Sequence, residues 1–97
     1  MTRAVVFRPQ AEDEAFDVRR WYEARRVGLG EEFGGEVAAA VARIVESPLA
    51  FPRVRGETRR AVLARFPYAL YFRVTDEHIV VLAVHGRQAP ARWHSRS

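Results

Sequence analysis

The sequence predicts an α+β fold in which a helical hairpin packs on one face of a small antiparallel sheet. Two segments with helical periodicity follow one another in the first half of the chain and are joined by only a few residues. Three short runs with the composition of β-strands follow in the second half, separated by turn residues. With a short N-terminal strand, the expected order is β-α-α-β-β-β, and 97 residues are enough for one domain.

The N-terminal part is expected to be a strand followed by a helix. Residues 3–7 are rich in valine and phenylalanine, and Pro9 ends this strand. Residues 10–26 have acidic side chains in the first turn and arginines in the last turns, which the helix dipole favours. The apolar side chains expected to share the buried face of this helix, with Trp21 widening it, are Ala11, Ala15, Phe16 or Val18, and Tyr22.

A second helix is expected over residues 29–46, because its apolar side chains recur at helical spacing. The positions on this apolar face are Leu29, Phe33, Val37, Ala40, Val41, Ile44 and Val45. Gly34 and Gly35 lie within the helix and predict either close packing against a neighbour or a local kink. Pro48 ends the helix, since the residue before a proline is disfavoured in the helical conformation.

Strands are expected over residues 59–65, 68–74 and 78–85, after a loop over residues 49–58. If Val74 pairs with Ile79, one apolar face meets the helices, and it consists of Leu70, Phe72, Val74, Ile79, Val81 and Ala83. The other face is mixed and is expected to be partly open; it consists of Tyr71, Arg73, Val80 and Leu82. A β-bulge would reverse the faces beyond it.

Composition excludes several classes of protein. The chain has no cysteine, which excludes a disulfide framework, thiolate metal sites and a cysteine nucleophile. The longest apolar runs, such as residues 79–84, are too short to span a membrane, and the N-terminus is too soon interrupted for a secretory signal. We therefore expect a cytoplasmic protein with no membrane partner.

Charge is distributed unevenly along the chain. All 16 basic residues are arginines; residues 1–50 carry 7 of them with 9 acidic residues, and residues 51–97 carry 9 with 3 acidic residues. The first half therefore has a net charge of −2 and the second half +6. This asymmetry favours a C-terminal surface that meets nucleic acid or an acidic protein segment, and a solvated arginine surface is the alternative.

The histidines and carboxylates do not form a recognisable catalytic or metal site. His78, His85 and His94 lack the spacing of metal ligands, so we expect no metal and no cofactor. His85 precedes Gly86 at the end of the last strand, where a partner could approach closely. The sequence is consistent with either a functional or a structural role for this histidine. The acidic residues 12–14 are better explained by the helix dipole than by acid–base catalysis.

Metal-free cleavage of RNA is the one catalytic possibility that the residues leave open. It would need arginines to stabilise charge at the scissile phosphate and a group to transfer protons. The candidates are Arg65, Arg73 and Arg87, with Tyr71 or His85. The expected register argues against a shared site, because it places Arg65 and Arg73 on one face and Arg87 on the other.

Two segments carry a resemblance to a known family. Residues 65–74 read Arg-Phe-Pro-Tyr-Ala-Leu-Tyr-Phe-Arg-Val, and residues 84–90 read Val-His-Gly-Arg-Gln-Ala-Pro, followed by Trp93 and Arg96. Upstream lie Ser47-Pro48, Phe51-Pro52 and Arg59, and the first helix ends in Trp21-Tyr22. In this combination and order, they resemble the ParE branch of the RelE/ParE toxin superfamily over nearly the whole chain.

The resemblance implies the toxin of a type II toxin–antitoxin system. A small cognate antitoxin, ParD-like or similar, would neutralise it in a hetero-oligomer, with a C-terminal segment that folds on the helical hairpin groove and the sheet. The residues expected to contact the antitoxin are Tyr71, Arg73, Phe33, Val37 and Val41.

The resemblance also implies two alternative targets. ParE-type toxins act on DNA gyrase, whereas RelE-type relatives cut messenger RNA on the ribosome with lysines and a C-terminal tyrosine or similar group. This chain has no lysine and its last tyrosine is Tyr71, which favours a binding poison of gyrase over an enzyme. The expected target contacts are Arg87, Trp93 and Arg96, followed by Arg59 and Arg65. A non-toxic binding module for an acidic partner is the third possibility.

Overall fold

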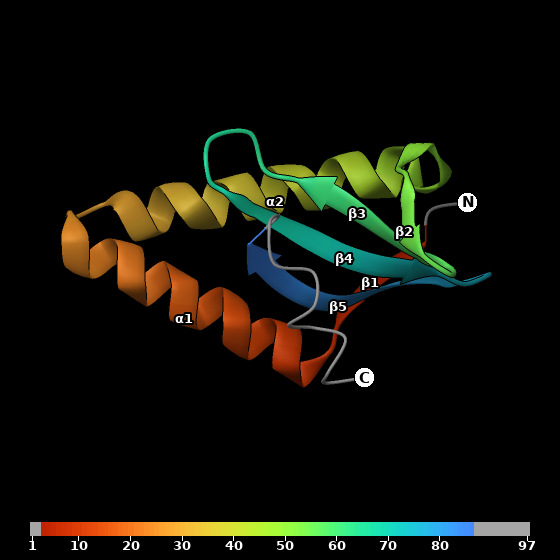
Figure 1. Ribbon diagram of the computed structural model, residues 1–97, viewed down its shortest axis with the longest axis horizontal. Coiled ribbons are helices and arrows are strands. Elements are labelled where there is room, and N and C mark those ends of the chain that lie inside the picture. The colour runs from red at the N-terminus through yellow and green to blue at the C-terminus, as the bar shows by residue number, and fades with distance from the viewer. Residues whose placement is uncertain (1–2, 87–97) are drawn as a thin grey trace.

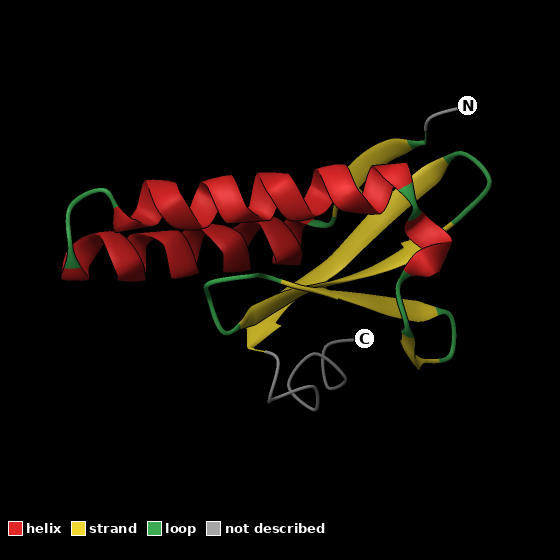
Figure 2. Ribbon diagram, turned by 90° about the horizontal axis from the view of Figure 1, so that it is seen from above, coloured by secondary structure: helices red, strands yellow, loops and turns green. Residues whose placement is uncertain are grey.

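The computed structural model describes residues 3–86 as a five-stranded sheet with two helices packed on one side of it (Figures 1 and 2). The elements are β1 (Ala4–Phe7), α1 (Pro9–Arg25), α2 (Leu29–Glu46), a short 3-10 helix (Pro48–Ala50), β2 (Arg53–Arg55), β3 (Thr58–Val62), β4 (Tyr68–Val74) and β5 (His78–Gly86). The predicted fold class is confirmed: α2 and β4 have the predicted bounds, α1 differs by one residue at each end, and β5 is one residue longer.

The strand order in the sheet is β1-β5-β4-β3-β2, with β1 parallel to β5 and the other neighbours antiparallel. The short strand β2 lies inside the segment that the sequence predicts as a loop. It was missed because three residues are too few to show an alternating pattern. Strand β3 ends at Val62 rather than at residue 65, and residues 63–67 form the turn into β4.

A β-bulge in the β4–β5 hairpin changes the predicted faces of β5. Val74 pairs with Ile79 as expected, but Tyr71 pairs with Ala83 while Phe72 pairs with Val81, so β5 contains one extra residue. The prediction that Ala83 faces the helices is therefore wrong, and Val84 takes that place in the core. The uniformly apolar run of residues 79–84 contains no alternation that could have located the bulge.

The core lies between the helices and the sheet. Its buried members are Ala11, Phe33, Ala40, Ile44, Ala61, Leu63, Phe66, Leu70, Phe72, Ile79, Val81 and Val84. On α1, Val18 packs against this core, whereas Phe16 is 59% exposed and Trp21 is 50% exposed. The prediction that Trp21 widens the buried face is wrong, because it lies one residue, or about 100°, away from the partly buried Tyr22. The guanidinium of Arg25 instead stacks on the exposed Trp21 ring, 3.4 Å from its centroid.

Glycines at the start of α2 allow the two helices to approach closely. Gly28 precedes α2 with a φ of 91°, a left-handed conformation that glycine adopts without steric cost. A Cβ atom at Gly30 would lie 2.7 Å from the carbonyl oxygen of Arg19 on α1, so only glycine fits this crossing. The predicted close packing also holds at Gly34, which faces the Arg19 side chain, but not at Gly35, which faces open space.

Candidate functional site

A groove of about 280 Å³ lies between the two helices. Its lining is Phe7, Glu12, Ala15, Phe16, Arg19, Phe33, Gly34 and Val37. Two of the predicted antitoxin contacts, Phe33 and Val37, belong to this lining. Phe16 and Arg19 of α1 were not predicted as contacts, and they meet Phe33 and Val37 here because α1 and α2 approach closely at Gly30. The groove therefore combines an apolar floor with one charge of each sign.

The other predicted antitoxin contacts lie elsewhere. Val41 packs partly buried against the core, and Arg73 is exposed on the face of the sheet that lies opposite the helices. Tyr71 is on that same face but is fully buried, in a small cluster with Ala69 and Ala83. The expectation of a partly open second face is thus wrong for Tyr71, which is fully buried. The predicted set divides between the groove and this face.

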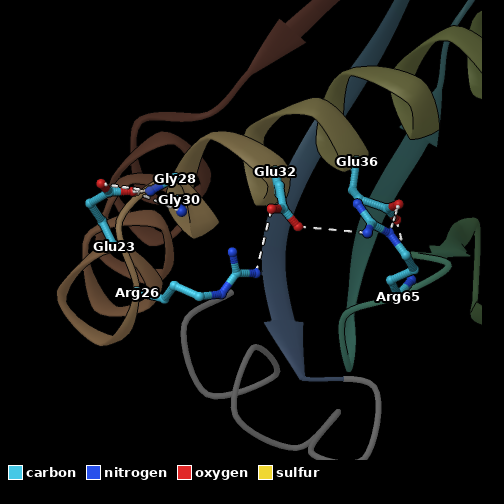
Figure 3. A network of polar contacts seen from close by, with 7 residues as sticks. All are labelled: Glu23, Arg26, Gly28, Gly30, Glu32, Glu36 and Arg65. Atoms are coloured by element: carbon cyan, nitrogen blue, oxygen red, sulfur yellow. Dashed lines mark hydrogen bonds and ion pairs between the residues drawn. The ribbon is translucent and has the colours of Figure 1, made fainter.

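Acidic residues of α2 bind the turn between β3 and β4 (Figure 3). Glu36 accepts hydrogen bonds from the Nε of Arg65 at 3.1 Å and from the backbone N–H groups of Ala64 and Arg65 at 3.0 and 3.3 Å. The Arg65 side chain, followed by these N–H groups, lowers the pKa of Glu36. One turn earlier, Glu32 pairs with Arg65 at 3.6 Å and with Arg26 at 3.4 Å. Arg65 therefore forms structural ion pairs on the helix side of the sheet.

Glu23 of α1 caps the N-terminus of α2 (Figure 3). Its carboxylate accepts hydrogen bonds from the N–H groups of Gly28 and Gly30, each at 3.0 Å. These two bonds lower the pKa of Glu23. A side chain from the preceding helix thus satisfies N–H groups that the first turn of a helix leaves without partners.

Aromatic rings join the same turn to the helical hairpin. The ring of Phe66 lies 4.8 Å from that of Tyr22 and 5.3 Å from that of Phe33, measured between centroids. Tyr68 packs against Phe33 at 5.8 Å, and burial, aided by the nearby Tyr68, raises the pKa of Tyr22. The Arg-Phe-Pro-Tyr segment that carries the family resemblance therefore fixes the turn against the hairpin.

The predicted arginine sites lie apart from one another. Arg59 on β3 donates hydrogen bonds to the carbonyl oxygens of Phe51 at 2.6 Å and Leu49 at 3.3 Å, which ties the 3-10 helix to the sheet. Arg65 precedes β4 and Arg73 lies near its other end, so their backbones are roughly 16 Å apart or more at the rise of a strand. The prediction that they share a face is wrong, because β3 ends before Arg65 and its side chain bonds to α2.

A buried carboxylate–imidazole pair joins α1 to β5. Glu14 accepts a hydrogen bond from the N–H of Val84 at 2.8 Å, and its other oxygen lies 3.2 Å from the Nε2 of His85. Both side chains are nearly buried, with 10% of Glu14 and 8% of His85 exposed. Because β1 pairs with β5 only as far as Val81, the carboxylate occupies the strand edge that β1 leaves uncovered. Nothing in the acidic run of residues 12–14 distinguished Glu14 from its neighbours.

The bulge also determines which residues share the face opposite the helices. Ala69 pairs with His85, so His85 lies on the same face as Tyr71 and Arg73. Arg60 of β3 pairs with Tyr71 and joins them. Within residues 3–86, the side chains of Arg60 and Arg73 form no ion pair, which leaves two cations for a partner.

Three predicted target contacts, Arg87, Trp93 and Arg96, lie outside the described residues. In the part of the chain that the structure describes, no three histidine, aspartate or glutamate side chains are grouped to hold a metal ion. None of its helices is long and apolar enough to cross a membrane.

Comparison with known proteins gives both a family and a fold. Residues 5–90 match the family model described as the ParE toxin of the type II toxin–antitoxin system, parDE. The structure resembles a chain of the chromosomal ParDE system from P. aeruginosa, with a TM-score of 0.74, 16% identity, and coverage of 88% of this chain and 96% of that one. No curated protein is significantly similar in sequence.

Two RelE-type structures share the fold as well. A chain of the toxin–antitoxin complex RelBE2 from Mycobacterium tuberculosis has a TM-score of 0.64 and 19% identity, with coverage of 90% of this chain and 100% of that one. An E. coli RelE mutant in the free state has a TM-score of 0.64 and 20% identity, with coverage of 98% and 93%. At these identities the likeness shows the fold, while the family model covers most of the sequence. The chain belongs to the ParE toxin family of type II toxin–antitoxin systems.

Proposed function

We propose that this toxin acts in the cytoplasm by binding and poisoning DNA gyrase, and not by cutting RNA. The observation that supports binding is the separation of the arginines within residues 3–86. Arg65 is paired with Glu36 on the helix side, whereas Arg73 is exposed on the opposite face. Cleavage of a phosphodiester would need charge stabilisation and proton transfer to converge on one phosphate.

The gyrase contact is proposed for the basic C-terminal segment. Arg59 and Arg65 are already engaged in hydrogen bonds and ion pairs within the fold, so they are weaker candidates than the sequence indicated. Arg87, Trp93 and Arg96 remain, and tryptophan and arginine are the residue types that most often dominate binding energy. If Arg87→Ala and Trp93→Ala variants fold and still arrest growth fully, this assignment is incorrect.

We further propose that the antitoxin lays the apolar face of a helix into the groove between α1 and α2. Phe16 lines this groove and is largely exposed, which suits it to an anchor contact. Phe16→Glu is expected to weaken antitoxin binding by about 2 kcal/mol or more, about 30-fold in Kd, when measured by calorimetry. Leu49→Glu is the matched control, because Leu49 is equally exposed but lies outside the groove. Equal effects of the two variants would contradict the placement.

Inducible expression of the chain alone in a bacterial host tests the proposed target. Supercoiling by purified gyrase and the integrity of total mRNA would be measured in parallel with growth. Growth arrest with lost supercoiling and intact mRNA supports the proposal, whereas arrest with cleaved mRNA refutes it. Absence of arrest from a folded chain would favour the third alternative, a non-toxic module for an acidic partner.

An mRNA endonuclease of the RelE type is the second candidate, and one observation favours it. The bulge places His85 at a register position on the same face as Tyr71 and Arg73, although Tyr71 is fully buried and His85 lies against Glu14. In that case His85→Ala would abolish mRNA cleavage in the expression assay.

A further inference from the structure

We propose that two copies of this chain associate through the groove when no antitoxin occupies it, with their α1 helices side by side and antiparallel. Such a dimer has two-fold symmetry, so the same surface of each copy meets itself. The proposal goes beyond the proposed function, because neither the gyrase contact nor the antitoxin contact requires self-association. It adds a second occupant of the groove, one that competes with the antitoxin.

The face of α1 that borders the groove carries charges of alternating sign. Its charged positions are Arg8, which directly precedes the helix, Glu12, Arg19 and Glu23. They are spaced by four, seven and four residues, which places them along one side of a helix. Ala15 and Phe16 lie at the centre of this series and line the groove together with the two inner charges. The order along the helix is therefore basic, acidic, apolar, basic, acidic.

This series is complementary to itself in the antiparallel direction. When a second α1 runs the opposite way, Glu12 of each copy lies opposite Arg19 of the other, and the two outer charges are paired in the same way. In this register Phe16 lies opposite Ala15, so a large side chain meets a small one. A parallel arrangement in register would instead bring like charges together, which repel one another.

The inner charges, Glu12 and Arg19, are available for a partner. Within residues 3–86 they form no ion pair, and both side chains are exposed. Glu23 follows Arg19 by one turn, but the N–H groups of Gly28 and Gly30 bind its carboxylate and are the main cause of its lowered pKa, with Arg19 a smaller cause. A second copy therefore supplies each inner charge with an opposite charge as the groove is closed off from water.

The centre of the groove offers an apolar seat for the Phe16 ring of a second copy. This ring is 59% exposed in the single chain. Phe33 and Val37 of α2 line the groove beside it, and Gly34 between them has no side chain to fill the space. Seating both rings removes apolar surface from water, which favours association. Because the groove is small, we expect the dimer to dissociate on dilution.

Sedimentation equilibrium of the purified chain without antitoxin tests the proposal, at protein concentrations from about 1 μM to about 1 mM. The wild-type chain should show a monomer–dimer equilibrium. Glu12→Arg and Arg19→Glu should each raise the dimer Kd by at least about 10-fold, because like charges then face each other. The double variant restores opposite charges and should return Kd to within about 3-fold of the wild-type value. An equimolar mixture of the two single variants should form a heterodimer, because one copy then carries two arginines at these positions and the other carries two glutamates.

Asp13→Arg and Arg20→Glu are matched controls, because they make the same changes of charge one residue away and outside the groove lining. Both should change Kd by less than about 3-fold. All four positions are exposed, so we expect the variants to fold, and circular dichroism checks this. If the controls weaken the dimer as much as the groove variants do, general charge repulsion explains the result and the proposed contact is refuted.

The outcomes also separate this inference from the proposed function. A chain that stays monomeric over the whole concentration range refutes the dimer and leaves the antitoxin contact untouched. Addition of the small protein encoded beside the gene should dissociate the dimer, because both bind the groove. A complex that contains this protein and still loses its toxin–toxin contact on Arg19→Glu would support the dimer and refute the placement of the antitoxin.

Discussion

Removal of the Glu14 carboxylate should destabilise the fold more than any other single change in the acidic start of α1. In Glu14→Ala, the N–H of Val84 loses the acceptor that lies 2.8 Å away, and His85 loses the carboxylate at 3.2 Å. Neither lost contact can be replaced freely by water, because both side chains are nearly buried.

The expected magnitude follows from these two contacts. A hydrogen bond to a charged group contributes roughly 1.5–3 kcal/mol, and leaving a buried donor without its partner costs roughly 1–3 kcal/mol. We expect Glu14→Ala to lower the free energy of unfolding by about 3 kcal/mol. Glu14→Gln should cost less, because its amide oxygen can still accept the Val84 hydrogen bond.

Urea unfolding followed by circular dichroism measures this difference, and Asp13→Ala is the matched control. Asp13 is exposed in the same turn and forms no side-chain hydrogen bond or ion pair within residues 3–86, so the helix dipole is its main interaction there, worth about 0.3–1 kcal/mol. If Glu14→Ala costs no more than Asp13→Ala, the buried pair does not stabilise the fold. In a double-mutant cycle, Glu14→Ala and His85→Ala together should cost less than the sum of the single changes.

Three further changes test other contacts. The pKa of Glu36 is below the usual 4.5 in the folded chain, so its contribution to stability is complete above the unfolded-state pKa and is lost as the pH falls through the folded-state pKa. Glu36→Gln should therefore reduce the loss of stability between about pH 6 and pH 3 in urea titrations. Gly30→Ala should destabilise the chain, because its Cβ would lie 2.7 Å from the Arg19 carbonyl oxygen. Gly35→Ala, in open space, should raise the free energy of unfolding by about 0.5–1 kcal/mol, and equal effects of the two changes would contradict the close approach. Arg59→Ala should lower the free energy of unfolding by about 2 kcal/mol in thermal or urea unfolding, since the carbonyl groups of Leu49 and Phe51 lose their charged donor.

The elements that the sequence predicted well are those with long amphipathic patterns. Both helices bury a regular stripe, so their periodicity located them to within one residue at each end. Strand β2 escaped prediction because it has three residues, all exposed. The bulge in β5 escaped it because every residue near Leu82 is apolar, and register depends on pairing geometry that such a run does not encode.

The candidate site was only partly accessible to sequence reasoning for a similar reason. Phe33 and Val37 could be predicted as neighbours because they lie one turn apart on one helix. Phe16 joins them only through the crossing of two helices, which depends on the close approach at Gly30. Glu14 and His85 are far apart in the sequence, and only the uncovered edge of β5 brings them together.

The position of β5 in the sheet bears on when the chain can fold during its synthesis. Strand β5 lies between β1 and β4, yet it is the last of the described elements to leave the ribosome. Until β5 emerges, β1 has no neighbouring strand in the sheet. The apolar faces of α1 and α2 also lack the central part of the sheet that covers them in the folded chain. Contacts between segments so distant in the sequence form slowly, because a long loop must close first. The nascent chain therefore exposes its helical hairpin until β5 has emerged, and the native sheet of the described residues forms only after that.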